Sequence, residues 1–205
     1  MMKSGLDNML VRSLDTVIKE NLSKSTLQKI ENRLCEKYGL TITQALEDFK
    51  KLDVVLKEFF GPEADVLKKR ILENVCILEP EQRDRDWIII EDKSLTKIIL
   101  ESFGDEDKKK ILTTVLDEPH IISEILDICS IPQTSGYRKI NSLINDGLLT
   151  TKGFITTFDG KKVNKYISVF ENVRIDIIKN KITIRVKLGK DSMTGSTMIQ
   201  LIQSL

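Results

Sequence analysis

Apolar residues recur every three or four positions through the first 78 residues, which is the spacing of an amphipathic helix. Gly39 suits the position just past a helix end, and Pro62 suits the first position of a new helix. The stripes predict four helices: residues 5–21, from Ser23 or Ser25 to Tyr38, residues 43–60, and residues 62–78. Short joints let four such helices share one core. We therefore expect residues 1–78 to form an all-α helical bundle.

A polar stretch, EPEQRDRD at residues 79–86, follows these helices and predicts a domain boundary. A short amphipathic helix is expected next, at residues 94–103, so that residues 79–104 form a linker with a connecting helix. Trp87 and the three isoleucines after it are interpreted as an anchor that packs the linker onto a domain. A tryptophan exposed to stack on a ligand is the alternative.

The rest of the chain changes from a helical to an alternating period. Helices are predicted at residues 106–117 with Asp105 as the cap, at residues 121–130, and from Pro132 onward. From Thr150 the apolar period is two, which predicts strands at residues 154–158, 163–170, 173–178 and 182–188. Three short helices followed by a β-hairpin are typical of a winged helix-turn-helix.

The expected fold class is therefore α+β. It consists of the N-terminal helical bundle and then, at residues 105–190, a winged helix-turn-helix domain with an extended antiparallel β-sheet. Residues 191–205 form a polar tail that ends in a short amphipathic segment, a candidate dimerisation helix.

Composition and charge narrow the classes of function. Hydrophobic residues make up 40% of the chain and charged residues 31%, as in ordinary globular proteins. No apolar run approaches the ~20 residues of a membrane span, and the N-terminus has no signal-peptide pattern, so we expect no membrane partner and a cytoplasmic location. The three cysteines, Cys35, Cys76 and Cys129, lie in apolar helical patterns and are predicted to be buried, reduced thiols.

The net charge of +1 is unevenly distributed along the chain. Residues 1–90 carry −1, residues 91–149 carry −4, and residues 150–205 carry +6. Only the last quarter of the chain has a composition that by itself favours an acidic partner.

The helix that begins at Pro132 has a distinctive polar face. No acid occurs in residues 132–145, whereas a solvated helix usually mixes both signs because opposite charges pair on its surface. On a helical wheel centred at Ile140, the residues expected to face the core are Gly136, Tyr137, Leu143 and Ile144. The opposite side and its flanks carry hydroxyls, amides and cations: Thr134, Ser135, Arg138, Lys139, Asn141, Ser142 and Asn145. Such side chains suit base edges and phosphate oxygens, which predicts a helix that reads DNA.

The hairpin after this helix has basic residues near its turn. The connection is DGKK at residues 159–162, with Lys165 just beyond it, and lysines there suit a phosphate or a minor-groove edge. A solvated turn without a partner is the competing interpretation. The complete set of predicted DNA-contacting residues is Gln133, Thr134, Ser135, Tyr137, Arg138, Lys139, Asn141, Ser142, Asn145, Lys161, Lys162 and Lys165.

Residues 105–188 resemble the ArsR-like winged-helix regulators common in archaea. DEDKKKIL (105–112) is similar to their first helix, ISEIL (122–126) to their second, and PQTSGYRKINSLINDGLL (132–149) to their recognition helix. KYISVF (165–170) and the strand pair after it resemble the sheet that follows the wing. The resemblance implies sequence-specific binding of double-stranded DNA in transcription control, usually as a homodimer. It places Thr134, Ser135, Arg138 and Ser142 at the groove, and Tyr137 between the core and a backbone phosphate.

The first 78 residues resemble the small helical output-type (NitrOD-like) domain of ammonia-oxidising archaea. The likeness is carried by LCEKYGL (34–40) and ALEDFKKLD (45–53). It implies a signalling or interaction module.

No motif in the chain predicts catalysis, a cofactor or a metal. Gly189 and Gly195 do not have the spacing of a phosphate-binding loop, and capping and the helix dipole explain the acids at residues 105–107. The metal sensors of the ArsR-like group use cysteine and histidine clusters, whereas Cys129 and His120 stand alone here. We therefore expect neither an enzyme nor a metal sensor.

The sequence thus predicts a homodimeric DNA-binding regulator, with the helix at residues 94–103 and the tail at residues 197–205 as candidate dimer contacts. The alternative is a protein–protein interaction module whose winged helix no longer binds DNA. The negative charge of residues 91–149 favours that alternative.

Overall fold

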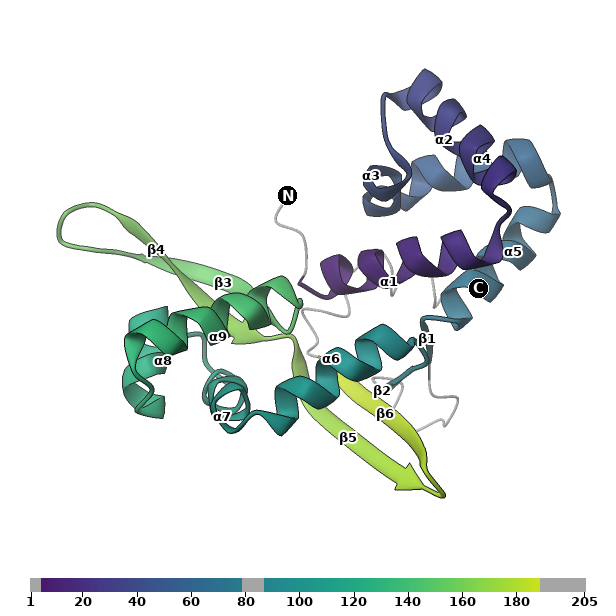
Figure 1. Ribbon diagram of the computed structural model, residues 1–205. Helices are drawn as coiled ribbons and strands as arrows, with labels where there is room; N and C mark the ends of the chain where they lie inside the picture. Colours follow the sequence, from purple (N-terminus) through teal and green to yellow (C-terminus); the bar gives the residue numbers. More distant parts are fainter. Residues whose placement is uncertain (1–4, 79–86, 189–205) are drawn as a thin grey trace.

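A computed structural model describes residues 5–78 and 87–188 and confirms the α+β class (Figure 1). The N-terminal helices are α1 (Gly5–Asn21), α2 (Lys24–Tyr38), α3 (Ile42–Glu47), α4 (Phe49–Phe60) and α5 (Glu63–Glu73). They pack around one core that includes the fully buried Leu14, Ile30 and Val55. None of the helices in the described ranges combines the length and the apolar content of a membrane span.

Local capping determines where these helices begin and end. Ser23 is the N-cap of α2, since its hydroxyl accepts the Thr26 N–H at 3.1 Å. Gly39 ends α2 in the left-handed region, at φ 66°, as its position predicts. The helix expected over residues 43–60 is divided into α3 and α4, because Asp48 leaves the helical conformation at φ −126° and ψ 71°.

The structure differs from the sequence prediction most clearly after α5. The last helix of the bundle stops at Glu73, and β1 (Cys76–Leu78) follows where we expected its final turn. The predicted linker anchor is β2 (Trp87–Ile90), which pairs with β1 on one side. The apolar, β-branched composition of both segments suits a buried strand.

The partner of β2 on its other side comes from the far end of the chain. β5 (Phe170–Ile178) and β6 (Lys181–Leu188) form a hairpin, and β6 pairs with β2 to give an antiparallel sheet of order β1-β2-β6-β5. Ile88 lies opposite Val186 and Ile90 opposite Ile184, and all four side chains are buried. The C-terminal strands therefore form a sheet with the segment that follows the bundle. The predicted boundary at residues 79–86 and the tail at 191–205 lie outside the described residues.

The connecting helix α6 (Lys93–Gly104) is capped by Asp92, which accepts the Leu95 N–H at 2.7 Å. Its apolar residues Leu95 and Ile99 are buried within the chain, and the helix packs against α1 (Figure 1). The chain's own residues therefore cover the most buried part of this stripe, which we expected as a candidate dimer contact.

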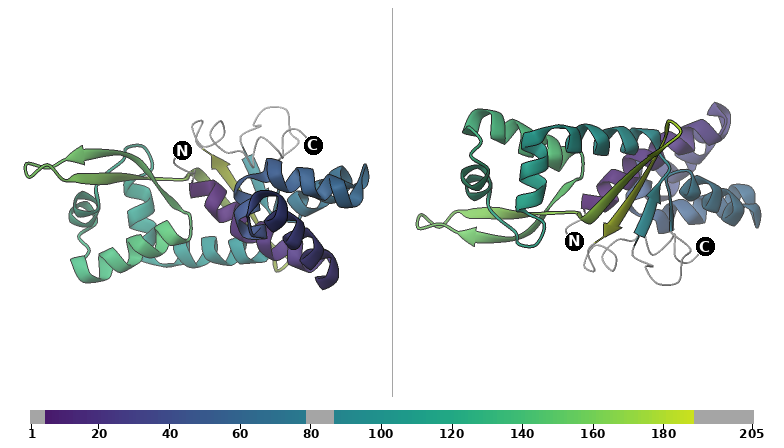
Figure 2. Two further views of the ribbon diagram at one scale, coloured as in Figure 1. Left: turned by 90° about the horizontal axis from the view of Figure 1, so that it is seen from above. Right: turned by 90° about the horizontal axis from the view of Figure 1, so that it is seen from below.

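Residues 106–168 form a unit at the end of the molecule opposite α2–α5 (Figures 1 and 2). Its helices are α7 (Glu106–Thr114), α8 (Ile122–Cys129) and α9 (Gln133–Asn145), and each contacts the other two. The hairpin of β3 (Leu149–Thr156) and β4 (Lys162–Ser168) follows. His120, between α7 and α8, exchanges two backbone hydrogen bonds with Tyr166 of β4, at 3.1 and 2.7 Å, and so ties the helices to the hairpin.

The close approach of α9 to α8 gives a test of this packing. A Cβ on Gly136 would lie 2.2 Å from Leu126 Cδ2 and 3.2 Å from Ile131 Cγ2, and Leu126 is itself buried. We expect Gly136→Ala to lower the free energy of unfolding by about 1–3 kcal/mol, because the overpacking outweighs the better helix propensity of alanine. Urea unfolding measures the change, with Asn141→Ala on the exposed side of α9 as the control. If Gly136→Ala were as stable as the Asn141→Ala control, α8 and α9 would be packed less tightly at Gly136 than the structure shows.

Candidate nucleic-acid interface

α9 is fixed by its apolar side and displays its polar side. Ile140 and Leu143 are fully buried against the other helices, and the carbonyl of Pro132 accepts the Gly136 N–H at 2.9 Å in the first turn. The exposed side chains of α9 are Gln133, Thr134, Tyr137, Arg138, Asn141 and Asn145. Most of the predicted α9 contacts are thus at the surface.

Tyr137 departs from the helical-wheel prediction. It was placed among the residues facing the core, but 44% of its surface is exposed. Its neighbour Gly136 lies where α9 approaches α8 most closely. The side chain of Tyr137 points in a different direction from the helix, so its ring does not pack between α9 and α8. An aromatic ring is therefore added to the polar face.

Lys139 was predicted to contact DNA, but the structure turns it toward α7. Its Nζ lies 2.6 Å from both carboxylate oxygens of Asp105 and 3.1 Å from Asp107 Oδ2. Asp105 is also the N-cap of α7, as predicted, and accepts the N–H groups of Asp107 and Lys108 at 3.0 Å. The hydrogen bond from Lys139 is the main reason that the pKa of Asp105 is lowered, and the same bond raises the pKa of Lys139. Lys139 holds α9 against the start of α7.

Two of the predicted hydroxyls are also engaged within the domain. Ser142 Oγ accepts a hydrogen bond from Lys108 Nζ at 3.0 Å and donates one to Asp146 Oδ2 at 3.1 Å. Ser135 Oγ donates to the Pro132 carbonyl at 3.1 Å. Both side chains are half-buried, so their first role is to hold the two ends of α9.

Arg12 of α1 is a contact that the sequence did not reveal. Its Nη1 donates to the carbonyl of Asn145 at 2.5 Å, across 133 positions of sequence. A cation at the C-terminus of a helix is favoured by the helix dipole. No local pattern distinguishes Arg12 from the other charged residues of α1, so only the folded chain places it there.

The β3–β4 hairpin presents its basic residues near the turn. Gly160 has a φ of 78°, and the Lys161 carbonyl accepts the Thr157 N–H at 2.9 Å. Lys161 and Lys162 are exposed, with Lys161 Nζ 2.9 Å from Asp159 Oδ2. A hydrogen bond from the Thr157 hydroxyl, aided by Lys161, lowers the pKa of Asp159.

Lys165 differs from the two lysines at the turn. It is half-buried on β4. The backbone N–H of Ile121 is the main reason that the pKa of Glu124, at the start of α8, is lowered, and the charge of Lys165 adds to this. Lys165 therefore lies toward the helices and away from the hairpin tip.

Two exposed aromatic residues on the hairpin were not among the predicted contacts. Phe158 is fully exposed in the turn, and Phe154 on β3 is 53% exposed with Lys162 Nζ 4.6 Å from the centre of its ring. The alternating period places both residues on one side of an extended segment, but the sequence does not show that this side is uncovered.

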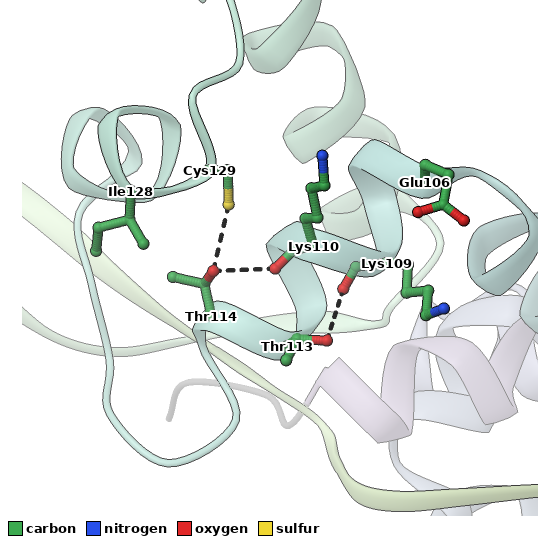
Figure 3. A pocket seen from close by; sticks show the side chains of 7 residues that line it. All are labelled: Glu106, Lys109, Lys110, Thr113, Thr114, Ile128 and Cys129. Carbon is green, nitrogen blue, oxygen red and sulfur yellow. Dashed lines mark hydrogen bonds between the residues drawn. The ribbon is translucent and has the colours of Figure 1, made fainter.

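A hollow between α7 and α8 offers no comparable chemistry (Figure 3). Its hydroxyls are satisfied locally, since Thr113 and Thr114 donate to the carbonyls of Lys109 and Lys110 at 2.9 and 3.0 Å. Cys129 Sγ points at Thr114 Oγ1, 3.2 Å away. Across residues 5–78 and 87–188, no three His, Cys, Asp or Glu side chains are grouped so that they could hold a metal ion.

The cysteines are only partly as predicted. Cys76 is buried, and this burial raises its pKa to about 12, so it stays a protonated thiol. Cys129 is half-buried, but Cys35 is exposed because the helix turns it away from the buried Leu34 beside it. All three are free thiols.

The Lys139–Asp105 pair predicts a pH-dependent stability. Because folding lowers the pKa of Asp105, the pair stabilises fully above the unfolded pKa of about 3.9, and this contribution is lost as the pH falls through the folded pKa. Asp105→Asn keeps a capping side chain but removes the charge. We expect it to lower the free energy of unfolding at pH 7 by about 1 kcal/mol or less, since the pair is partly exposed.

Urea unfolding from pH 7 to pH 3 measures this difference between the wild type and Asp105→Asn, and it should shrink in acid. The exposed Asp117→Asn serves as the control. A difference that stays constant with pH would contradict the assigned charge pair.

Comparison with known proteins does not extend this description. No protein-family model, curated protein or solved structure matches the chain significantly. What α9 and the β3–β4 hairpin do must therefore be inferred from their own geometry and chemistry.

Proposed function

We propose that this protein is a DNA-binding transcriptional regulator, in which α7, α8, α9 and the β3–β4 hairpin act as a winged helix-turn-helix. The order of these elements and the pairing of His120 with the hairpin support that reading. The observation that carries the proposal is the exposed, acid-free polar face of α9 beside a hairpin with two exposed lysines at its turn. Arg138 on α9 and the two lysines at the turn bring positive charge to this surface.

The spacing on α9 suits the major groove. Thr134, Arg138, Asn141 and Asn145 recur every three to four residues, so they lie along one side of the helix. Arginine can donate two parallel hydrogen bonds to a guanine, and asparagine can pair with the edge of an adenine. We assign the reading of bases to Arg138 and Asn141, and phosphate contacts to Thr134 and the Tyr137 hydroxyl.

The hairpin is assigned to the DNA backbone. Lys161 and Lys162 are exposed and carry no fixed geometry for a base edge, so they suit phosphate oxygens. Lys161 already pairs with Asp159, and it would exchange this partner for a phosphate on binding.

A protein–protein interaction module remains the second candidate. The observation in its favour is the exposure of Tyr137, Phe154 and Phe158, because aromatic residues are enriched at protein interfaces. The two functions differ in their response to salt, since only binding to DNA releases counterions from a phosphate backbone.

Arg138→Ala tests whether α9 contacts the bases of DNA. We expect the wild type to shift genomic DNA fragments in an electrophoretic assay, and the affinity for its preferred fragment to fall by about 1–3 kcal/mol in the variant. Arg70→Ala removes the same charge from an exposed site on α5, outside the proposed winged helix, and should bind like the wild type. Equal binding by both variants would reject the assigned face, and no shift at low salt would reject DNA binding altogether.

A double variant, Lys161→Ala with Lys162→Ala, tests the hairpin. Each phosphate contact contributes about 0.9 to the slope of log affinity against log salt concentration. We expect the slope to become about 2 less steep, with affinity reduced to a similar extent on all DNA sequences. Fluorescence anisotropy over a salt series measures it. A slope equal to that of the wild type would remove the hairpin from the interface.

A further inference from the structure

β5 is the outer strand of the four-stranded sheet, and it is nine residues long. No strand in the described ranges pairs with its outer edge, so its outward N–H and C=O groups are available to another strand. Long open edges of this kind are sites of pairing with another chain, and most proteins shorten or cover them.

The end of the β5–β6 hairpin also extends past the rest of the sheet (Figures 1 and 2). β2 pairs with β6 only between Ile184 and Lys187, so no third strand among the described residues lies beside the turn end of the hairpin. On one face of this end, Ile175, Ile177 and Ile182 are exposed, and Ile177 is exposed to 67%. Further along the same face, Ile184 and Val186 are buried. The apolar face of the β5–β6 hairpin is thus only partly covered by the rest of the described chain.

The charges on β5 are arranged so that the strand complements itself. Arg174 precedes Ile175 and Asp176 follows it, and Glu171 and Lys179 repeat the opposite signs further out. If two β5 strands pair antiparallel with Ile175 at the centre, Arg174 of each copy lies opposite Asp176 of the other. Opposite charges placed directly across an antiparallel pair stabilise it, and a twofold dimer uses the same patch on both copies.

The same register covers the exposed isoleucines. It places Ile177 of one copy opposite Val173 of the other, because both lie two positions from the central Ile175. Val173 is packed against the core of its own chain, whereas Ile177 is not. The exposed Ile177 of each copy therefore packs beside Val173 of the other copy, and this contact removes apolar surface from water.

Arg174 and Asp176 each have one partner within their own chain and can take a second. The Arg174 guanidinium lies 5.3 Å from the ring centre of Trp87, and Asp176 accepts a hydrogen bond from Arg185. A stacked guanidinium keeps its N–H donors, and a carboxylate with one bond accepts others. We propose that β5 is a homodimer interface, in which two copies of this chain join antiparallel through β5, centred on Ile175, into one continuous sheet.

Charge exchange tests both the interface and its register, and it requires no DNA. R174D and D176R each place like charges opposite one another in a homodimer. We expect the wild type to be a dimer at micromolar concentration and each single variant to dimerise about tenfold more weakly or worse. An equimolar mixture of R174D with D176R restores opposite charges across the pair, as does the double variant R174D/D176R, so both should dimerise again. Sedimentation equilibrium measures the masses.

Lys97→Asp on α6 is the matched control, because it makes the same charge change at an exposed site away from β5 and should leave the dimer intact. Recovery in the mixture also shows that the single variants are folded. A monomeric wild type would overturn the proposal. So would single variants that dimerise like Lys97→Asp, or a mixture that stays monomeric.

Discussion

The pairing of β2 with β6 joins the middle of the chain to its last described strand. Residues 87–90 meet residues 184–187, and Ile88, Ile90, Ile184 and Val186 are buried along the contact. The chain between them must leave the sheet as α6 and return to it through β5. Because α6 is packed against α1, this return path also sets where the unit of α7, α8 and α9 lies relative to the bundle. A short pairing with one buried apolar face thus supports both halves of the molecule.

α9 shows how one helix can be fixed firmly and still present a free surface. Its inner side approaches α8 closely at Gly136, Lys139 ties it to the start of α7, and Arg12 holds its C-terminal carbonyl from α1. Each of these contacts comes from a different element, so the helix has little freedom to tilt. A side chain such as Arg138 on the opposite side is then held in place by the backbone beneath it, which reduces the conformational entropy that a ligand must overcome.

Sequence patterns predicted the elements whose signals are local. Ser23, Gly39 and Asp105 cap helices as expected, because a cap depends on residues within one turn. The alternating period located β4, β5 and β6 approximately, but β3 begins at Leu149 and ends at Thr156, whereas we predicted a strand at residues 154–158. β1 and β2 were missed, since an apolar run of three or four residues suits a helix or a strand equally until its partner is known. The ion pair that turns Lys139 toward α7 was missed for a similar reason, because Asp105 lies 34 positions away in the sequence.

The net charge of residues 91–149 is a second example of a sequence property that does not predict a surface. Residues 91–149 carry a net −4, which by itself weighs against an acidic partner. In the structure, however, Asp105 and Asp107 pair with Lys139, and Asp146 receives Lys108 and the hydroxyl of Ser142, all on the inner side of α9. A potential at a surface depends on where the charges lie, and paired charges contribute little to it at a distance. The sum over the segment therefore does not describe the exposed side of α9, where Arg138 is the charged residue that a ligand would meet.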